Sequence, residues 1–141
     1  MQYKFIDHSA DIAVEVSADT IENLFKISCS AWRKVVLDNI NLFSIEEKEI
    51  NLEAQSIEEL LVRFLNELNY YLYSNHWLFN SILSLSIINE KKIFQLKAKV
   101  AGEPLDNNIH RLKEEIKAVT YHHLKIVKKV NLFTTIIVFD I

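Results

Sequence analysis

Two segments of the chain carry apolar residues at steps of three and four, and this periodicity constrains the fold more than any other feature. They are Asp19–Leu37 and Ser56–Leu72, and each opens on a polar residue with a glutamate three positions later, Glu22 or Glu59. That spacing is typical of a capping box and predicts two helices that begin at Asp19 and Ser56. Their stripes should be buried, because each fully buried apolar side chain contributes about 1.5–3 kcal/mol. The stripes are Ile21, Leu24, Phe25, Ser28, Cys29, Trp32, Val35 and Val36, then Ile57, Leu60, Leu61, Phe64, Leu65, Leu68, Tyr71 and Leu72.

Between and after these segments, apolar and polar residues alternate as they do in strands. The alternation is clearest in Asp11–Ser17, where Asp11 stands at the start of the strand on its less apolar face. We expect hairpin turns at 89–92 and 128–131 and a polar loop at 102–115. The other predicted strands are Tyr3–Asp7, Glu47–Ala54, Leu83–Asn89, Ile93–Ala101, Ile116–Val127 and Phe133–Ile141.

The order of these elements predicts an α+β fold, with a largely antiparallel (mixed) β-sheet on which the two amphipathic helices pack. A length of 141 residues suits a single domain over residues 1–141. The chain has one glycine and one proline, Gly102 and Pro104, so its turns must rely on Asn, Asp and Ser. We expect Gly102 to end its strand with a positive φ.

Composition excludes several classes of function. The formal net charge of −3 argues against a domain that binds nucleic acid through its overall charge. No apolar run is long enough to span a bilayer, and Asp7 and His8 stand where a signal peptide needs an apolar core. The one cysteine, Cys29, lies on a predicted apolar stripe and is expected to be an inert core thiol. These features favour a cytoplasmic protein with no membrane partner.

Acidic residues stand at two predicted strand ends. Asp7, His8 and Asp11 lie within five positions near the N-terminus, and Asp140 precedes Ile141 after an apolar run. Oxygen ligands of this kind suit a hard divalent cation such as Ca²⁺, Mg²⁺ or Mn²⁺. The alternatives are an Asx-turn for the first group and a solvated strand end for the second, and spacing by itself leaves them open.

The remaining polar residues indicate less. His122 and His123 are neighbours in a predicted strand, so they point to opposite faces and do not chelate one ion together. His76 and His110 stand in loops, and Asp106 is expected to be a turn residue. The sequence has no glycine-rich phosphate loop, nucleophile elbow or histidine-glutamate zinc motif.

Four motifs, in this order, resemble those of the archease family. They are DHSADIAVEV (7–16), GEPLD (102–106) followed by His110, EIKAVTYHHLKI (115–126) and the final FDI (139–141). The helical segments also fit, so the resemblance covers essentially the whole chain. Ser9 stands where the family more often has Thr, and Ala13 where Gly is common, and neither change removes a proposed ligand.

The resemblance implies a non-catalytic accessory protein that promotes guanylylation and multiple turnover of an RtcB-type RNA ligase in tRNA splicing and RNA repair. It implies a divalent-metal site formed by Asp11, Asp140 and the main-chain oxygens of Ile141, with Asp7 and His8 in the same motif. Lys117, Thr120 and Tyr121 are candidates for the docking face, and RNA would be met only through the partner.

Two alternatives accompany this interpretation. The first is a chaperone-like modulator of an RNA-modifying enzyme such as a tRNA methyltransferase. The second is a metal-dependent phosphohydrolase that uses Asp7, His8, Asp11 and Asp140. The second lacks a general base paired with a nucleophile.

Overall fold

The computed structural model describes residues 1–6, 11–38, 42–121 and 123–141. The elements in chain order are β1 (Gln2–Ile6), β2 (Ile12–Ala18), α1 (Ile21–Val36), β3 (Glu46–Ala54), α2 (Ile57–Asn75), β4 (Trp77–Glu90), β5 (Ile93–Pro104), β6 (Ala118–Thr120), β7 (Val127–Lys129) and β8 (Leu132–Asp140). In the described residues every paired strand runs antiparallel to its neighbours. The predicted α+β class with antiparallel pairing is therefore confirmed.

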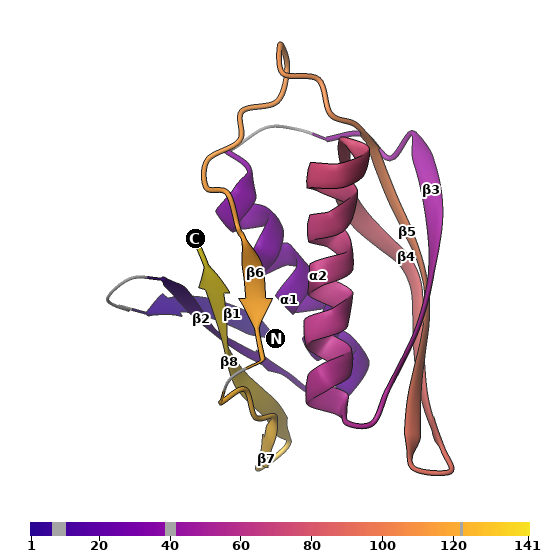
Figure 1. Cartoon of the computed structure of the whole chain (residues 1–141). Coiled ribbons are helices and arrows are strands. Elements are labelled where there is room, and N and C mark those ends of the chain that lie inside the picture. The colour runs from indigo at the N-terminus through magenta and orange to yellow at the C-terminus, as the bar shows by residue number, and fades with distance from the viewer. Residues whose placement is uncertain (7–10, 39–41, 122) are drawn as a thin grey trace.

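The strands divide into two sheets with the helices between them (Figure 1). The larger sheet has the order β1-β2-β8-β6, with β7 also paired to β8, and the smaller has the order β3-β5-β4. Helix α1 contacts β2 and β4, and helix α2 contacts β3, β4 and β6, so each helix touches both sheets. Burying both sides of a helix requires a wide apolar surface, which the two predicted stripes provide.

The helical stripes form the centre of one hydrophobic core. Phe25 of α1 stacks on Phe64 of α2 with ring centroids 6.1 Å apart, and both side chains are fully buried. Cys29 lies in this core, where burial raises the pKa of its thiol and keeps it protonated, as expected of an inert thiol. No helix in the described residues is both long enough and apolar enough to cross a membrane.

One predicted cap is confirmed and the other is wrong. Ser56 caps α2, because its Oγ accepts from the Glu59 N–H at 3.1 Å while Glu59 Oε2 accepts from the Gln55 N–H. Helix α1 is capped by Thr20 in place of Asp19, through Oγ1 and the Asn23 N–H. Asp19 instead accepts from the Asn23 side-chain amide at 2.8 Å, a bond that lowers the pKa of the Asp19 carboxyl.

Strand boundaries differ most at two places, while β5 also runs to Pro104, past the predicted Ala101, and β7 takes up half of the predicted turn 128–131. β4 begins at Trp77, because His76 adopts the left-handed conformation that ends α2, so the strand starts well before the predicted Leu83. The predicted strand Ile116–Val127 is wrong, since only the short strands β6 and β7 form at its two ends. Between them the Ile126 N–H donates to Glu58 Oε2, and the Lys125 carbonyl accepts from Thr135 Oγ1. Side chains thus form the hydrogen bonds that these backbone groups would make to a neighbouring strand in a continuous sheet.

Gly102 lies inside β5, and its backbone is not in the positive-φ region, so the predicted reason for this glycine is wrong. The position requires glycine because another backbone comes very close. A Cβ on Gly102 would stand 2.0 Å from the Leu78 carbonyl oxygen and 2.9 Å from the Trp77 ring. No side chain fits without moving β4 away from β5.

Gly102→Ala should therefore lower the free energy of unfolding by about 1–3 kcal/mol, the usual range for overpacking. Urea denaturation followed by circular dichroism measures this loss. Lys99→Ala, at an exposed position of the same strand, is the control and should change stability little. Equal stability of Gly102→Ala and wild type would contradict the close approach.

Candidate functional site

The pairing of β2 with β8 brings the two predicted acidic ends together. Ile12 pairs with Phe139, and the register continues in the antiparallel sense through Ala18 and Phe133. One further step along this register sets Asp11 opposite Asp140, directly before β2 begins and at the last residue of β8. We call this place, formed by Asp11 and Asp140, the acidic strand end.

Asp140 belongs to the face of the sheet that points away from the helices. Phe139 is fully buried toward the helices and Asp140 is exposed, as alternation along a strand requires. Asp11 is half-buried, and Ile141 packs partly against the core. Directly opposed residues of an antiparallel pair have Cβ atoms about 4.5–5.5 Å apart, so continuing the register to Asp11 and Asp140 brings their two positions close together.

The predicted docking residues are divided between two places. Lys117 lies at the acidic strand end, where its N–H donates to the Asp140 carbonyl at 2.7 Å and its side chain is exposed. Thr120 pairs with Val138, two positions further along β8. Tyr121 lies beyond β6, with its hydroxyl 3.5 Å from Ser56 Oγ at the start of α2.

Two asparagines of α2 hold β6 in place. The Asn66 side-chain amide exchanges two hydrogen bonds with the Val119 backbone, at 2.9 and 3.3 Å, and so imitates a neighbouring strand. Asn69 Oδ1 accepts from Trp32 Nε1, while Asn69 Nδ2 donates to the Ile116 carbonyl at 2.6 Å. Sequence reasoning missed both residues. The available signal was two asparagines, poor helix formers, in the middle of a long helix.

A cavity of about 540 Å³ opens beside Asp11. Its lysines come from two segments that the backbone ties together, since the Lys113 N–H donates to the Val36 carbonyl at 2.8 Å. Lys113 Nζ also lies 3.5 Å from the Lys34 carbonyl oxygen at the end of α1. The cavity lining thus combines two lysines, Lys34 and Lys113, with two acids, Asp11 and Glu114. The cavity is lined by Phe5, Ile6, Asp11, Ile12, Lys34, Val35, Lys113 and Glu114.

Asp7 and His8 lie outside the described residues. Within the part of the chain that the structure describes, no three His, Cys, Asp or Glu side chains form a group that could hold a metal ion. The oxygen-bearing residues that the β2–β8 register brings to one strand end are Asp11, Asp140 and Ile141. Their donors are all oxygens, the donor type that hard divalent cations prefer, so these residues fit Ca²⁺, Mg²⁺ or Mn²⁺ as part of a ligand set.

A buried pair that sequence reasoning did not find lies in the 102–115 segment. His110 Nε2 is 2.5 Å from Glu103 Oε1, and both side chains are buried. His110 Nδ1 accepts from the Asp106 N–H, so the ring proton is on Nε2, which donates to Glu103. Glu103 Oε2 also accepts from the Phe43 N–H. The pair therefore joins β5, the loop after it and the segment that enters β3.

Asp106 is a turn residue, as predicted, because its Oδ1 accepts from the Asn108 N–H at 2.9 Å. The GEPLD segment thus supports the fold of its own loop. Together, these features define a small α+β protein in which two helices lie between two antiparallel sheets.

The comparisons with known proteins agree with this class. Residues 3–141 match the Archease protein family (MTH1598/TM1083), and the chain belongs to this family of accessory activator proteins, which are not catalysts. It is 33% identical over 127 residues to the protein archease of Pyrococcus abyssi, with 90% of this chain and 89% of the relative covered. It is 31% identical over 140 residues to the protein archease of Methanosarcina barkeri, with 99% and 96% covered.

Two solved structures share the fold. The solution structure of Methanobacterium thermoautotrophicum protein 1598 aligns with a TM-score of 0.84 at 23% identity, covering 99% of this chain and 98% of that one. A Thermotoga maritima crystal structure, described as an archease and possible chaperone, aligns with a TM-score of 0.62 at 28% identity. It covers 100% of this chain and 98% of that one.

His110→Ala should lower the free energy of unfolding by about 2–4 kcal/mol, because it leaves the Glu103 carboxylate buried without its main donor. Glu103→Gln should cost less, since the amide oxygen still accepts from Nε2. Chemical denaturation of both variants measures which of them loses more free energy of unfolding. A larger loss in Glu103→Gln than in His110→Ala would contradict the assigned proton position.

Proposed function

We propose that this protein is a metal-binding activator of an RtcB-type RNA ligase, which promotes guanylylation of the ligase and its multiple turnover in tRNA splicing and RNA repair. Membership of the archease family supports the partner. The single observation that carries the site is the β2–β8 register, which sets Asp11 opposite Asp140. We place the activity in the cytoplasm and in the single domain 1–141.

The proposed ligands are the carboxylates of Asp11 and Asp140 and the main-chain oxygens of Ile141. Opposed carboxylates on adjacent strands repel each other, and a cation between them would replace that repulsion with attraction. A divalent cation supplies charge that neutralises phosphate oxygens during nucleotidyl transfer. For this role, the oxygen ligands have to lie at the shared end of β2 and β8, where a partner can approach.

The surroundings of the acidic strand end suit docking against a phosphate-bearing active site. Lys34 and Lys113 line the cavity next to Asp11. Lys117 is exposed and directly precedes β6. Ammonium groups attract phosphate oxygens as point charges. Asn66 and Asn69 fix β6 and the residue before Lys117 against α2, so the backbone on both sides of Lys117 is held in place.

Metal binding is the first test. Wild-type protein titrated with Ca²⁺ or Mn²⁺ should release or absorb heat, and Asp11→Asn or Asp140→Asn should weaken the binding about tenfold or more, because each removes one charged ligand. Glu49→Gln, an exposed carboxylate on β3, is the matched control and should bind as wild type does. Binding that is unchanged in both Asp variants would rule out the acidic strand end as the site.

Ligase turnover is the second test, and it needs the partner. With the RNA ligase at catalytic concentration, wild-type protein should raise product formation beyond one turnover per ligase, and Asp140→Asn should lose most of this stimulation. Its fold is checked by its unfolding transition. If Asp140→Asn stimulates as well as wild type does, the assigned role of the carboxylate fails even where metal binding is confirmed.

A second candidate is a chaperone-like modulator of a tRNA-modifying enzyme such as a tRNA methyltransferase. It is favoured by the description of the Thermotoga maritima relative as a possible chaperone. Light scattering of a heated methyltransferase distinguishes the two functions. Equal protection by wild type and Asp140→Asn in a chelator would support the chaperone, because that role requires no metal.

A further inference from the structure

The free edges of the two sheets are not alike. Natural proteins block edge strands with charge, shortness or a covering segment, because an open edge can pair with another strand. β1 has five residues and carries Lys4, and β6 and β7 have three residues each, with β6 held by Asn66. β3, at one edge of the smaller sheet, carries five charged side chains: Glu46, Glu47, Lys48, Glu49 and Glu53.

β4, at the other edge of the smaller sheet, has no charged residue from Trp77 to Asn89 and no proline. Its first part is engaged, since Arg33 Nη1 donates to the Asn80 carbonyl at 2.8 Å and Ser44 bonds Ser81. Its register shifts lie between Phe79 and Ser84. The first half of this edge is therefore both occupied and bent.

The segment Ser84–Asn89, which we call the bare edge, lacks these protections. It pairs with β5 in an unbroken register, from Ser84–Lys99 to Asn89–Phe94. Among the hydrogen bonds of the described residues, none connects its outer side to another segment. Ile88 is 53% exposed, although an isoleucine on a regular strand is normally covered.

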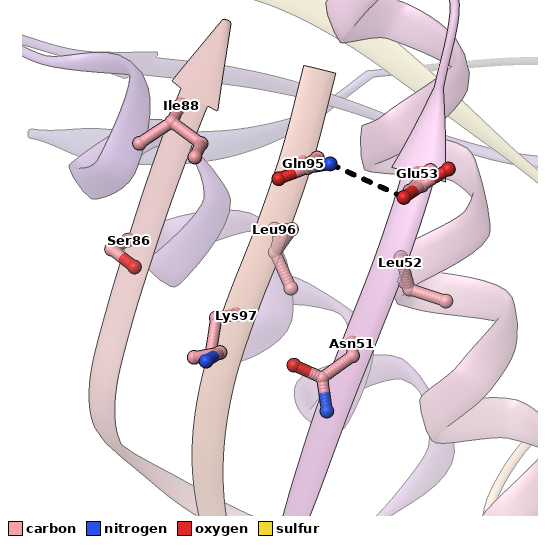
Figure 2. Close-up of a pocket in the computed structure, with 8 residues that line it drawn as sticks. All are labelled: Asn51, Leu52, Glu53, Ser86, Ile88, Gln95, Leu96 and Lys97. Carbon is pink, nitrogen blue, oxygen red and sulfur yellow. Dashed lines mark hydrogen bonds between the residues drawn. The ribbon is translucent and has the colours of Figure 1, made fainter. Parts of the chain in front are cut away.

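Figure 2 shows Ser86 and Ile88 on the outermost of three strands, beside Lys97 and Gln95 of β5 and Glu53 of β3. Glu53 accepts from Gln95 at 3.2 Å on the side away from β4. On the opposite face, Leu85 and Ile87 pack partly against the core. The bare edge thus presents Ser84, Ser86 and Ile88 on one face and Leu85 and Ile87 on the other.

We propose that the bare edge pairs with the same strand of a second copy of this chain, to form a six-stranded antiparallel sheet across a two-fold axis. The register is centred on Ser86, so that Leu85 of one copy lies opposite Ile87 of the other. This register places Leu85 and Ile87 of both copies on one face, because opposed residues share a face of the sheet. A register displaced by one residue would turn Leu85 and Ile87 of one copy to the face that carries Ser84 and Ser86 in the other.

Charge supports a second copy as the partner. Ser86 pairs with Lys97, and the two Lys97 side chains would be three strand spacings apart, about 14 Å. That exceeds the screening length of about 8 Å in physiological salt. Pairing of two bare edges therefore brings no like charges together, whereas pairing of two β3 strands would do so. An interface of one strand pair is small, so a weak, concentration-dependent dimer is expected.

The test is sedimentation velocity of the full chain over a range of concentrations. Wild type should shift from monomer to dimer as concentration rises. Ser86→Lys should raise the dissociation constant about tenfold or more, because two lysines would be directly opposed. Asn51→Lys is the matched control: Asn51 pairs with the same Lys97 from the other edge, so the new lysine has the same neighbour and should leave the dimer intact.

Cysteine cross-linking tests the register. Ser86→Cys should form a disulfide-linked dimer on mild oxidation, because opposed Cβ atoms are about 4.5–5.5 Å apart. Ser84→Cys should not, since its counterpart would be offset by four residues, about 13 Å. The native Cys29 is fully buried and does not compete. Matching unfolding transitions establish that each variant is folded.

Wild type that stays monomeric at every concentration, or Ser86→Lys that dimerises as wild type does, would overturn the proposal. Cross-linking of Ser84→Cys in preference to Ser86→Cys would overturn the register. If hydrogen exchange shows the bare edge protected only when the RNA ligase is added, the edge belongs to that partner and self-pairing is wrong.

Discussion

The pairing of β2 with β8 is the constraint on which the proposed function depends. It joins residues 12–18 to residues 133–139, and closing so long a loop has an entropic cost that must be recovered by burial. Val14 and Val16 on one strand and Ile137 and Phe139 on the other are buried on the same face, so they supply that burial. A shift of one residue would turn these side chains to solvent. The same register that buries them sets Asp11 opposite Asp140, and core packing thereby determines the geometry of the acidic strand end.

Helix α2 contributes both packing and polar anchoring. Its apolar stripe fills the space between the sheets, while Asn66 and Asn69 bond the backbone of Ile116 and Val119. Because β6 has only three residues, ladder hydrogen bonds to β8 would hold it weakly by themselves. Asn69 also accepts from Trp32, which links α1, α2 and the segment that carries Lys117. The Glu103–His110 pair has a similar role at the end of β5, where it secures the long loop.

Much of the fold was predictable because the decisive interactions are local or periodic. Ser56 caps α2, and Ile12, Val14 and Val16 alternate as expected, since both patterns depend on nearby residues. The failures share a cause: a long-range contact replaced the local rule. Residues 116–127 have strand-like composition, yet Glu58 and Thr135 take the backbone groups of Ile126 and Lys125. Gly102 was expected to end its strand with a positive φ, and it lies instead inside β5, where the Leu78 carbonyl leaves no room for a side chain.

By itself, the sequence determined the helix stripes, most strand segments and the family, and it singled out Asp11 and Asp140 as candidate ligands, because composition and spacing along the chain carry that information. Only the tertiary structure decided that Asp11 and Asp140 stand at the same strand end, that α2 holds β6 by amide side chains, and that Glu103 meets His110. It also decided which edge of the smaller sheet stays open. These outcomes depend on which strands become neighbours and in which register, and that choice is made by packing of the whole core and not by any segment of it.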